Sequence, residues 1–285
     1  MDTVSDTDLT LHEAAEELGV HYMTAYRYVR LGVLPAMKVG GTWHVARVDL
    51  DAFRAGVANA AVTDQPKRRA PWAARLEARL VAGDSSGAWG VVEAALAAGA
   101  DLDEIYLDVI TPAMRNIGRR WEVGELDISV EHRATGIAQR LIGRLGPRFA
   151  RRGRTRGHVL LGGPSGERHS LPVAMLADLL RGEGWEVSDL GADMPTESFV
   201  SAATSAPALA AIGVSISSVE GAAAAPDLCA ALRRAVPGVA IVLGGAAVRG
   251  REHALELGAT HHAGSAGEFA ELLASGDALT PRAGA

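Results

Sequence analysis

The most constraining feature of this 285-residue sequence is a change in the spacing of its apolar residues near residue 157. Before that point, apolar residues recur with the period of a helix in four stretches: AARLEARLVA, WGVVEAALAA, IYLDVITPAM and VEHRATGIAQRLIGRL. After it, short apolar runs alternate with helical stretches, which is typical of a parallel sheet covered on both faces. The pattern predicts a four-helix bundle over residues 72–150 and an α/β domain over residues 151–280.

The α/β part should contain five strand–helix units. The expected strands are HVLLGG, WEVSDLG, LAAIGVSIS, VAIVLGG and ATHHA, and the expected helices cover residues 170–182, 196–204, 226–235, 251–257 and 267–274. Five such units are typical of a flavodoxin-like or Rossmann-like domain, whose ligands bind beyond the C-terminal ends of the strands. The chain as a whole is therefore expected to be a multidomain α and α/β protein.

Residues 1–56 have the pattern of a winged helix-turn-helix. Thr10 and Glu13 have the spacing of a capping box, in which both side chains satisfy backbone amides at a helix start. After a glycine turn, a second helix is expected over residues 22–31. The segment MKVGGTWHV predicts two strands joined by a glycine pair, and a last helix should begin at Asp49.

In this motif the second helix enters the major groove, and the wing contacts phosphates. The residues expected to contact DNA are Thr24, Arg27, Arg30, Lys38, Thr42, His44 and Arg47. Residues 9–56 resemble the excisionase-type branch of the MerR superfamily, which implies duplex DNA as a partner. A small helical protein–protein module is the alternative reading of the same segment.

Composition limits the remaining classes. The net charge of −6 argues against a protein whose whole surface is basic and binds nucleic acid, but DNA binding needs only a local basic face. Residues 57–71 lack hydrophobic periodicity and are expected to be a linker. The single cysteine, Cys229, excludes an internal disulfide, and no apolar run is long enough to span a membrane. We expect a cytoplasmic protein.

A histidine follows the first strand of the predicted sheet. His169 should project into the ligand crevice, where an imidazole can ligate a metal. Glu167, two positions earlier, can hydrogen-bond the other ring nitrogen and fix its tautomer. Alone, this pair is weak evidence, because most such histidines are ordinary surface residues.

Small residues at the ends of two further strands strengthen this interpretation. They are Ser215 and Ser217 after the third strand and Gly244 and Gly245 after the fourth, and small residues there let a bulky ligand approach the backbone. The set resembles the cobalamin-binding signature D/E-x-H-x-x-G, S-x-L, G-G. The resemblance implies that His169 is the lower axial ligand of cobalt, that Glu167 orients it, and that the four small residues line the nucleotide tail of the cofactor. Pro172 and Ser217 depart from the signature, which has glycine and leucine there.

A second motif lies in the helical block. Trp121 precedes Glu131 and His132 by the spacing W-x9-EH, which by itself also suits a core tryptophan before a charged helix. Beside a cobalamin signature it resembles the motif of cobalamin-dependent photoreceptor regulators of the CarH type. That resemblance implies that these three residues cover the upper face of adenosylcobalamin, and that His132 ligates cobalt after photolysis. Ile128 stands beside the motif and narrows the room for a large upper ligand.

These resemblances imply a light-responsive, DNA-binding transcription regulator with adenosylcobalamin as chromophore. A single DNA-reading head per chain calls for a homo-oligomer, and the resemblance implies a cofactor-dependent tetramer in the dark. We expect no enzyme, since the sequence shows neither a catalytic barrel nor a nucleophile triad. Two alternatives remain open: a regulator that senses corrinoid without light, and a corrinoid carrier protein for methyl transfer.

Overall fold

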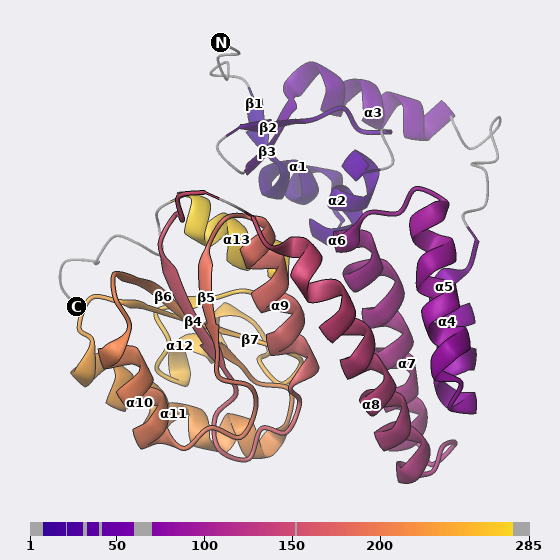
Figure 1. Cartoon of the computed structure of the whole chain (residues 1–285). Helices are drawn as coiled ribbons and strands as arrows, with labels where there is room; N and C mark the ends of the chain where they lie inside the picture. Colours follow the sequence, from indigo (N-terminus) through magenta and orange to yellow (C-terminus); the bar gives the residue numbers. More distant parts are fainter. Residues whose placement is uncertain are drawn as a thin grey trace.

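The computed structural model describes residues 8–20, 22–30, 33–39, 42–59, 70–151 and 153–275. Three parts are distinguished in Figure 1: a small head, a helical bundle and an α/β domain. The glycine pair of the predicted hairpin and most of the predicted linker lie outside the described residues. In the described part of the chain, no helix is both long and apolar enough to cross a membrane.

The head is a winged helix-turn-helix. Its elements are β1 (Asp8–Thr10), α1 (Leu11–Leu18), α2 (Tyr22–Arg30), β2 (Met37–Val39), β3 (Thr42–Ala46) and α3 (Arg47–Asn59). The capping box is present, because Thr10 Oγ1 accepts from Glu13 N and Glu13 Oε2 accepts from Thr10 N at 2.8 Å. Two features differ from prediction. β1 adds a third strand against β3, and α3 begins at Arg47 and continues to Asn59, so residues 57–59 of the predicted linker are helical.

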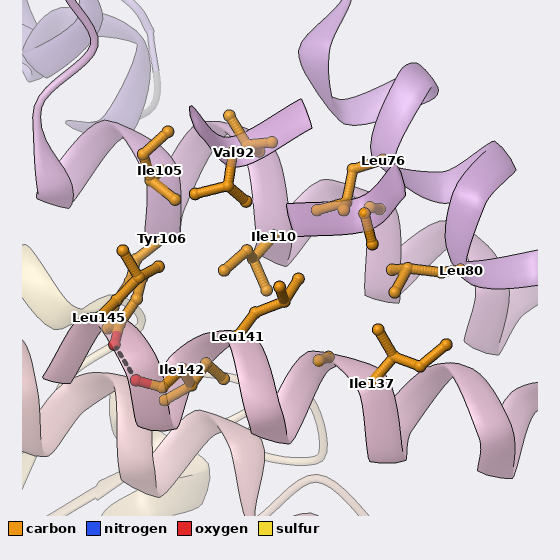
Figure 2. Packing of buried hydrophobic residues seen from close by; sticks show 14 of the residues in the cluster. Leu76, Leu80, Val92, Ile105, Tyr106, Ile110, Ile137, Leu141, Ile142 and Leu145 are labelled. Atoms are coloured by element: carbon orange, nitrogen blue, oxygen red, sulfur yellow. Dashed lines mark hydrogen bonds between the residues drawn. The ribbon is translucent and has the colours of Figure 1, made fainter. Parts of the chain in front are cut away.

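The bundle contains four antiparallel rods around an apolar core, as the helical periodicity predicted (Figure 2). The rods are α4 (Trp72–Ala82), α5 (Ser85–Ala97), a composite of α6 (Leu102–Glu104), η1 (Ile105–Ile110) and α7 (Thr111–Glu122), and α8 (Ile128–Leu145). The third rod contains a π-helical segment, η1, which periodicity alone does not reveal. Thr111 Oγ1 donates to the carbonyl of Tyr106 at 2.8 Å and so satisfies an oxygen of that segment.

A short 3-10 helix, η2 (Gly146–Phe149), leads into the α/β domain. The strands are β4 (His158–Gly162), β5 (Glu186–Asp189), β6 (Leu209–Ser215), β7 (Ala240–Gly244) and β8 (His261–His262), all parallel, in the order β5-β4-β6-β7-β8. This is the flavodoxin-like order, in which the first strand lies between the second and the third. The helices are α9 (Leu171–Gly182), α10 (Thr196–Ser205), α11 (Val219–Ala235), α12 (Arg251–Glu256) and α13 (Ala266–Ser275).

One helix start differs clearly from prediction. α11 begins at Val219, not at residue 226, because Ser218 caps it by accepting from Gly221 N at 3.0 Å. Pro226 was expected in the first turn, where proline is well tolerated, but it lies inside the helix. The alanine-rich segment before Pro226 has a high helix propensity and supports the earlier helix start.

The bundle and the α/β domain share a buried interface. Phe149 and Leu171 belong to the apolar core of the bundle. The Tyr106 hydroxyl donates to Asp178 Oδ2 on α9 at 2.8 Å and also approaches the carbonyl of Ile142, a contact that Figure 2 shows. The interface therefore combines apolar packing with a hydrogen bond that is shielded from water.

The head meets the α/β domain through fewer contacts. Lys38 Nζ on the wing lies 2.7 Å from Glu183 Oε1. Tyr22, the first residue of α2, is 5% exposed and packs against α13, where a methyl group on Gly267 would come within 2.8 Å of its ring. Burial raises the pKa of the Tyr22 phenol, and the hydrogen-bonded neighbour Glu271 raises it further. The start of α2, the helix expected to contact DNA, thus faces the body of the protein.

Candidate functional site

The carboxyl ends of β4 and β6 form the switch point of the sheet, because β5 and β6 lie on opposite sides of β4. His169 lies in the loop after β4, and Ser215 is the last residue of β6. Ser215 pairs in register with Gly244, the last residue of β7. The topology therefore brings the signature residues to one edge of the sheet.

Glu167 is fully buried at this edge and holds two loops together. Its Oε1 accepts from the backbone N–H of His169 at 2.9 Å and contacts the His169 ring at Nδ1, 2.5 Å away. Its Oε2 accepts from the backbone N–H groups of Ser217 and Ser218, at 2.5 and 2.9 Å. Burial alone would raise the pKa of Glu167, but these hydrogen bonds outweigh it and lower the pKa to about 2. The carboxylate is therefore ionised at neutral pH.

The imidazole of His169 suits metal ligation. The hydrogen bond to Glu167 raises its pKa, while partial burial opposes that change. With Nδ1 turned to the carboxylate, Nε2 is left for a ligand, and 54% of the side chain is exposed. A carboxylate behind a ligating histidine fixes the tautomer and increases the basicity of the ring. An exposed imidazole nitrogen with a carboxylate behind the ring fits a cobalt ion at this edge of the sheet.

The glycine pair after β7 is required by the backbone itself. Gly245 has φ = 107°, which is strained for any residue with a side chain, and a Cβ there would lie 2.3 Å from the carbonyl oxygen of Ile216. A Cβ on Gly244 would lie 2.4 Å from the carbonyl oxygen of Ala263. The two glycines thus let neighbouring loops pack closely at the ligand edge.

The two departures from the signature have structural explanations. Pro172 lies in the first turn of α9, where its missing N–H costs no helical hydrogen bond. Ser217 supplies its backbone N–H to Glu167, a contact that does not depend on its side chain.

The second motif lies at one end of the bundle. Trp121 is in the last turn of α7, and Ile128, Glu131 and His132 are in the first turns of α8. Trp121 is 41% exposed and Ile128 is 42% exposed, so two large apolar side chains are accessible at this end of the bundle. Glu131 accepts from Thr135 Oγ1 at 2.8 Å and lies 2.7 Å from His132 Nδ1. The residues of this motif therefore lie at the same end of the bundle, where α7 ends and α8 begins.

This end of the bundle lies near His169. Gln139 on α8 donates to the hydroxyl of Ser170 at 3.3 Å, beside His169 in the chain. The negative charges of Glu131 and Glu122 add to the increase in the pKa of His169, after the larger effect of Glu167. The structure therefore brings the residues predicted to ligate cobalt and those predicted to cover the upper face of the cofactor to the same region.

The residues predicted to contact DNA differ in their burial and in their interaction partners. Lys38 pairs with Glu183, and Arg47 pairs with Glu17 of the head. The Nδ1 atom of His44 is buried without a hydrogen-bond partner among the described residues. Thr24 and Thr42 are half-buried. The side chains of Arg27 and Arg30 lie outside the described part of the chain.

Several structural partners of the site were missed by sequence reasoning. Ser218 donates both its N–H and its hydroxyl to Glu167, and Gly221 lies close to the same carboxylate. Ser218 could have been found as the N-cap of a helix that begins earlier than expected. Tyr106 and Asp178, which join the bundle to the α/β domain, carry no local signal because they are far apart in the sequence.

Comparison with known families agrees with this geometry. Residues 72–145 and residues 157–274 each match a family model described as a B12 binding domain. Residues 9–56 match a model described as a helix-turn-helix domain.

Two curated relatives match part of the chain, both called trimethylamine corrinoid protein 1. The protein from Methanosarcina acetivorans is 31% identical over 118 residues, covering 39% of this chain and 52% of the relative. That from Methanosarcina mazei is 30% identical over 113 residues, with the same coverage. The chain thus spans about half the length of the curated relatives that it matches.

One solved structure has the same fold over most of the chain. It is the monomethylamine corrinoid protein of Methanosarcina barkeri, with a TM-score of 0.60 at 22% identity, covering 70% of this chain and 95% of that protein. The histidine–glutamate pair at the switch point, the helical bundle above it and the two domain matches lead to one conclusion. The chain is a cobalamin-binding protein with two B12-binding domains and a helix-turn-helix domain in front of them.

Proposed function

We propose that this protein is a DNA-binding transcription regulator that uses adenosylcobalamin to sense light. The observation that carries the regulatory part is the presence of a winged helix-turn-helix in the same chain as the two B12-binding domains. A carrier of methyl groups does not need a DNA-reading head. In this proposal the chain is not an enzyme, and its partners are a duplex DNA operator and further copies of itself.

The site residues have separate roles in this proposal. When bound, adenosylcobalamin supplies a cobalt–carbon bond that visible light cleaves. His169 would hold cobalt through Nε2, with Glu167 fixing its tautomer. Trp121 offers an exposed flat apolar surface, and Glu131 offers a carboxylate that can accept hydrogen bonds.

The signal would pass through the bundle. Trp121 lies in the last turn of α7, so loss of an adenosyl group packed against it would remove a restraint on that helix. His132 is exposed beside Glu131 and can approach the vacated upper side of the cofactor. A two-state movement of α7 and α8 would change any oligomer contact made by the bundle. We propose a homotetramer in the dark that dissociates in light.

A corrinoid carrier for methyl transfer is the second candidate. It is favoured by the names of the two curated relatives, which are corrinoid proteins. A corrinoid sensor that does not use light is a further alternative, because Ile128, beside Trp121 and Glu131, leaves less room for an upper ligand as large as the adenosyl group.

The deciding experiment loads the full chain with adenosylcobalamin in darkness. Its visible spectrum, its mass by size-exclusion chromatography and its binding to the promoter region of its own gene are measured before and after green light. The proposal expects all three to change together. Binding of methylcobalamin or hydroxocobalamin with rejection of adenosylcobalamin would instead support the sensor that does not use light. Absence of DNA binding in every state would support the carrier.

Substitutions test the individual roles. His169→Ala should weaken cobalamin retention or shift the spectrum to a form without a protein nitrogen ligand, whereas His12→Ala, a surface histidine of the head, should do neither. Trp121→Ala should weaken the dark assembly. The cofactor bound to His132→Ala should still be photolysed, but the variant should not form the stable product in which both His169 and His132 bind cobalt. An unchanged His169→Ala spectrum and affinity would remove the ligand assignment.

A further inference from the structure

A strongly basic segment joins the bundle to the α/β domain. Residues 148–156 contain five arginines and no acidic residue, although the whole chain carries a net charge of −6. We call this segment the arginine loop. The side chains described there as exposed include Arg148, Arg151, Arg154 and Arg156. Within the described residues, Arg148, Arg151 and Arg154 form no ion pair. Positive charge is thus concentrated on one exposed segment.

The backbone at the end of the arginine loop is fixed by the sheet. Arg156 N donates to the carbonyl of Gly184 at 2.9 Å, and Glu186 N donates to the carbonyl of Gly157 at 2.9 Å. The guanidinium of Arg156 lies over the ring of Trp185, 5.3 Å from its centre. The backbone at the C-terminal end of the arginine loop is therefore already fixed, so the loop loses less conformational entropy when a ligand binds.

The arginine loop borders a hollow that the wing also lines. The hollow has a volume of about 930 Å³ and is lined by Lys38 of β2, by Arg151, Arg154 and Arg156 of the loop, and by Arg181 and residues 183–187. Three of these cations are already engaged, since Lys38 pairs with Glu183, Arg181 pairs with Asp178 at 2.8 Å, and Arg156 lies over the ring of Trp185. The loop arginines extend the basic surface of the wing onto the α/β domain.

The chemistry of this surface favours a polyanion with regularly spaced charges. Guanidinium groups bind phosphate through two parallel hydrogen bonds, and several such groups in a row match a phosphodiester backbone. The one large apolar residue of the segment, Phe149, is buried in the bundle core, and the only other apolar residue is the small Ala150, so the loop has no large apolar side chain to insert into a lipid surface. The wing beside it is the part of the head expected to contact phosphates.

We propose that the arginine loop is a second surface for the DNA backbone, adjacent to the wing. The inference rests on the proposed DNA-binding function and adds to it a contact made by the cobalamin-binding part of the chain. Since the loop would contact phosphates, its contribution should be the same for every DNA sequence. It should appear mainly in the salt dependence of binding, because each phosphate contact releases counterions.

The test uses the full chain loaded with adenosylcobalamin in the dark. Affinity is measured by fluorescence anisotropy between 50 and 200 mM salt, on a duplex from the promoter region and on an unrelated duplex of equal length. Each phosphate contact changes the salt slope by about 0.9, so two lost contacts should make the fall in affinity over this range about tenfold smaller. This result is expected for Arg151→Gln/Arg154→Gln on both duplexes. Arg151→Lys/Arg154→Lys should restore most of the slope.

A matched control carries the same change in charge elsewhere. Arg233 and Arg234 are exposed at the end of α11, and Arg233→Gln/Arg234→Gln should leave the slope unchanged. An unaltered cobalamin spectrum shows that each variant is folded. If the wild type binds DNA but the loop variant has the wild-type slope, or the control loses as much, the inference is overturned and the proposed function stands. If the wild type binds no duplex in any light or cofactor state, the proposed function fails, and this inference with it.

Discussion

The bundle and the head are attached to the same α/β domain in different ways. The bundle contact includes the buried Tyr106–Asp178 hydrogen bond and the apolar side chains of Phe149 and Leu171. The head contact relies on the ion pair between Lys38 and Glu183, which is partly exposed, and on the packing of one tyrosine against α13. Burial makes the first contact costly to break, whereas water and salt screen the ion pair of the second. We therefore expect the bundle and the α/β domain to unfold together and the head to separate more easily.

The largest expected effect comes from Tyr106. Replacing this fully buried ring by alanine should cost about 3–5 kcal/mol of unfolding free energy, the usual range for a buried aromatic residue. Tyr106→Phe keeps the ring and removes the hydroxyl, leaving Asp178 with Arg181 as partner, so it should cost about 1–3 kcal/mol. Urea unfolding measures both. The comparison fails if Tyr106→Ala destabilises the chain no more than a substitution at the head contact.

The second effect concerns acid stability at the ligand edge. The pKa of Glu167 is about 2 in the folded protein and about 4.5 when unfolded. Its carboxylate therefore stabilises the fold above pH 4.5, and this contribution is lost as the pH falls toward 2. At 1.36 kcal/mol for each pKa unit, the contribution is about 3 kcal/mol at neutral pH.

Glu167→Gln should lose this stabilisation at pH 7 and flatten the acid limb of the stability curve. The curve is obtained from urea unfolding at a series of pH values. Glu186→Gln, at the exposed start of β5, is the control and should have little effect at pH 7. A variant as stable as the wild type at pH 7 would show that Glu167 does not hold the two loops together.

A smaller effect should appear where the head rests on α13. Burial raises the pKa of Glu271, and Glu268 acts in the same direction, whereas Tyr22, His12 and His44 lower it. A raised pKa means that the contact is most stable below the unfolded pKa and weakens as the pH rises through the folded value. Glu271→Gln stays neutral and should remove this pH dependence. Amide protection factors of α13 report the change, and the same pH profile in both proteins would contradict it.

The smallest effect is expected at Lys38. Its ion pair with Glu183 is partly exposed, so Lys38→Ala should change the unfolding free energy by at most about 1 kcal/mol. The cobalamin spectrum should not change. A larger loss in urea unfolding would show that the head is an integral part of the cobalamin unit.

Periodicity and strand-end logic predicted much of this molecule. The four apolar stretches of the bundle and the five strand runs are local patterns, and the parallel order then places His169 at the same edge of the sheet as Ser215 and Gly244. The partnership of Glu167 with His169 was also predictable, since the two residues are only two positions apart. Local pattern was sufficient wherever the relevant neighbours are close in sequence.

Long-range contacts were not predictable in this way. Nothing near Tyr106 indicates that it bonds Asp178, and nothing near Tyr22 indicates that it packs against α13. The five arginines of residues 148–156 are visible in the sequence as a basic cluster, but only the fold shows that Arg151, Arg154 and Arg156 line a hollow together with Lys38 of the wing. The predicted start of α11 at residue 226 was wrong, because the helix begins at Val219, where Ser218 provides the cap.

The way Glu167 is held affects which sequences this site can tolerate. The carboxylate is bound by main-chain N–H groups at positions 169, 217 and 218. Every amino acid except proline supplies such a group. Side chains at position 217 are therefore able to diverge while the acid at 167 is retained. A serine at 217 in place of leucine is one such permitted exchange, and a proline there would remove a donor that no side chain can replace.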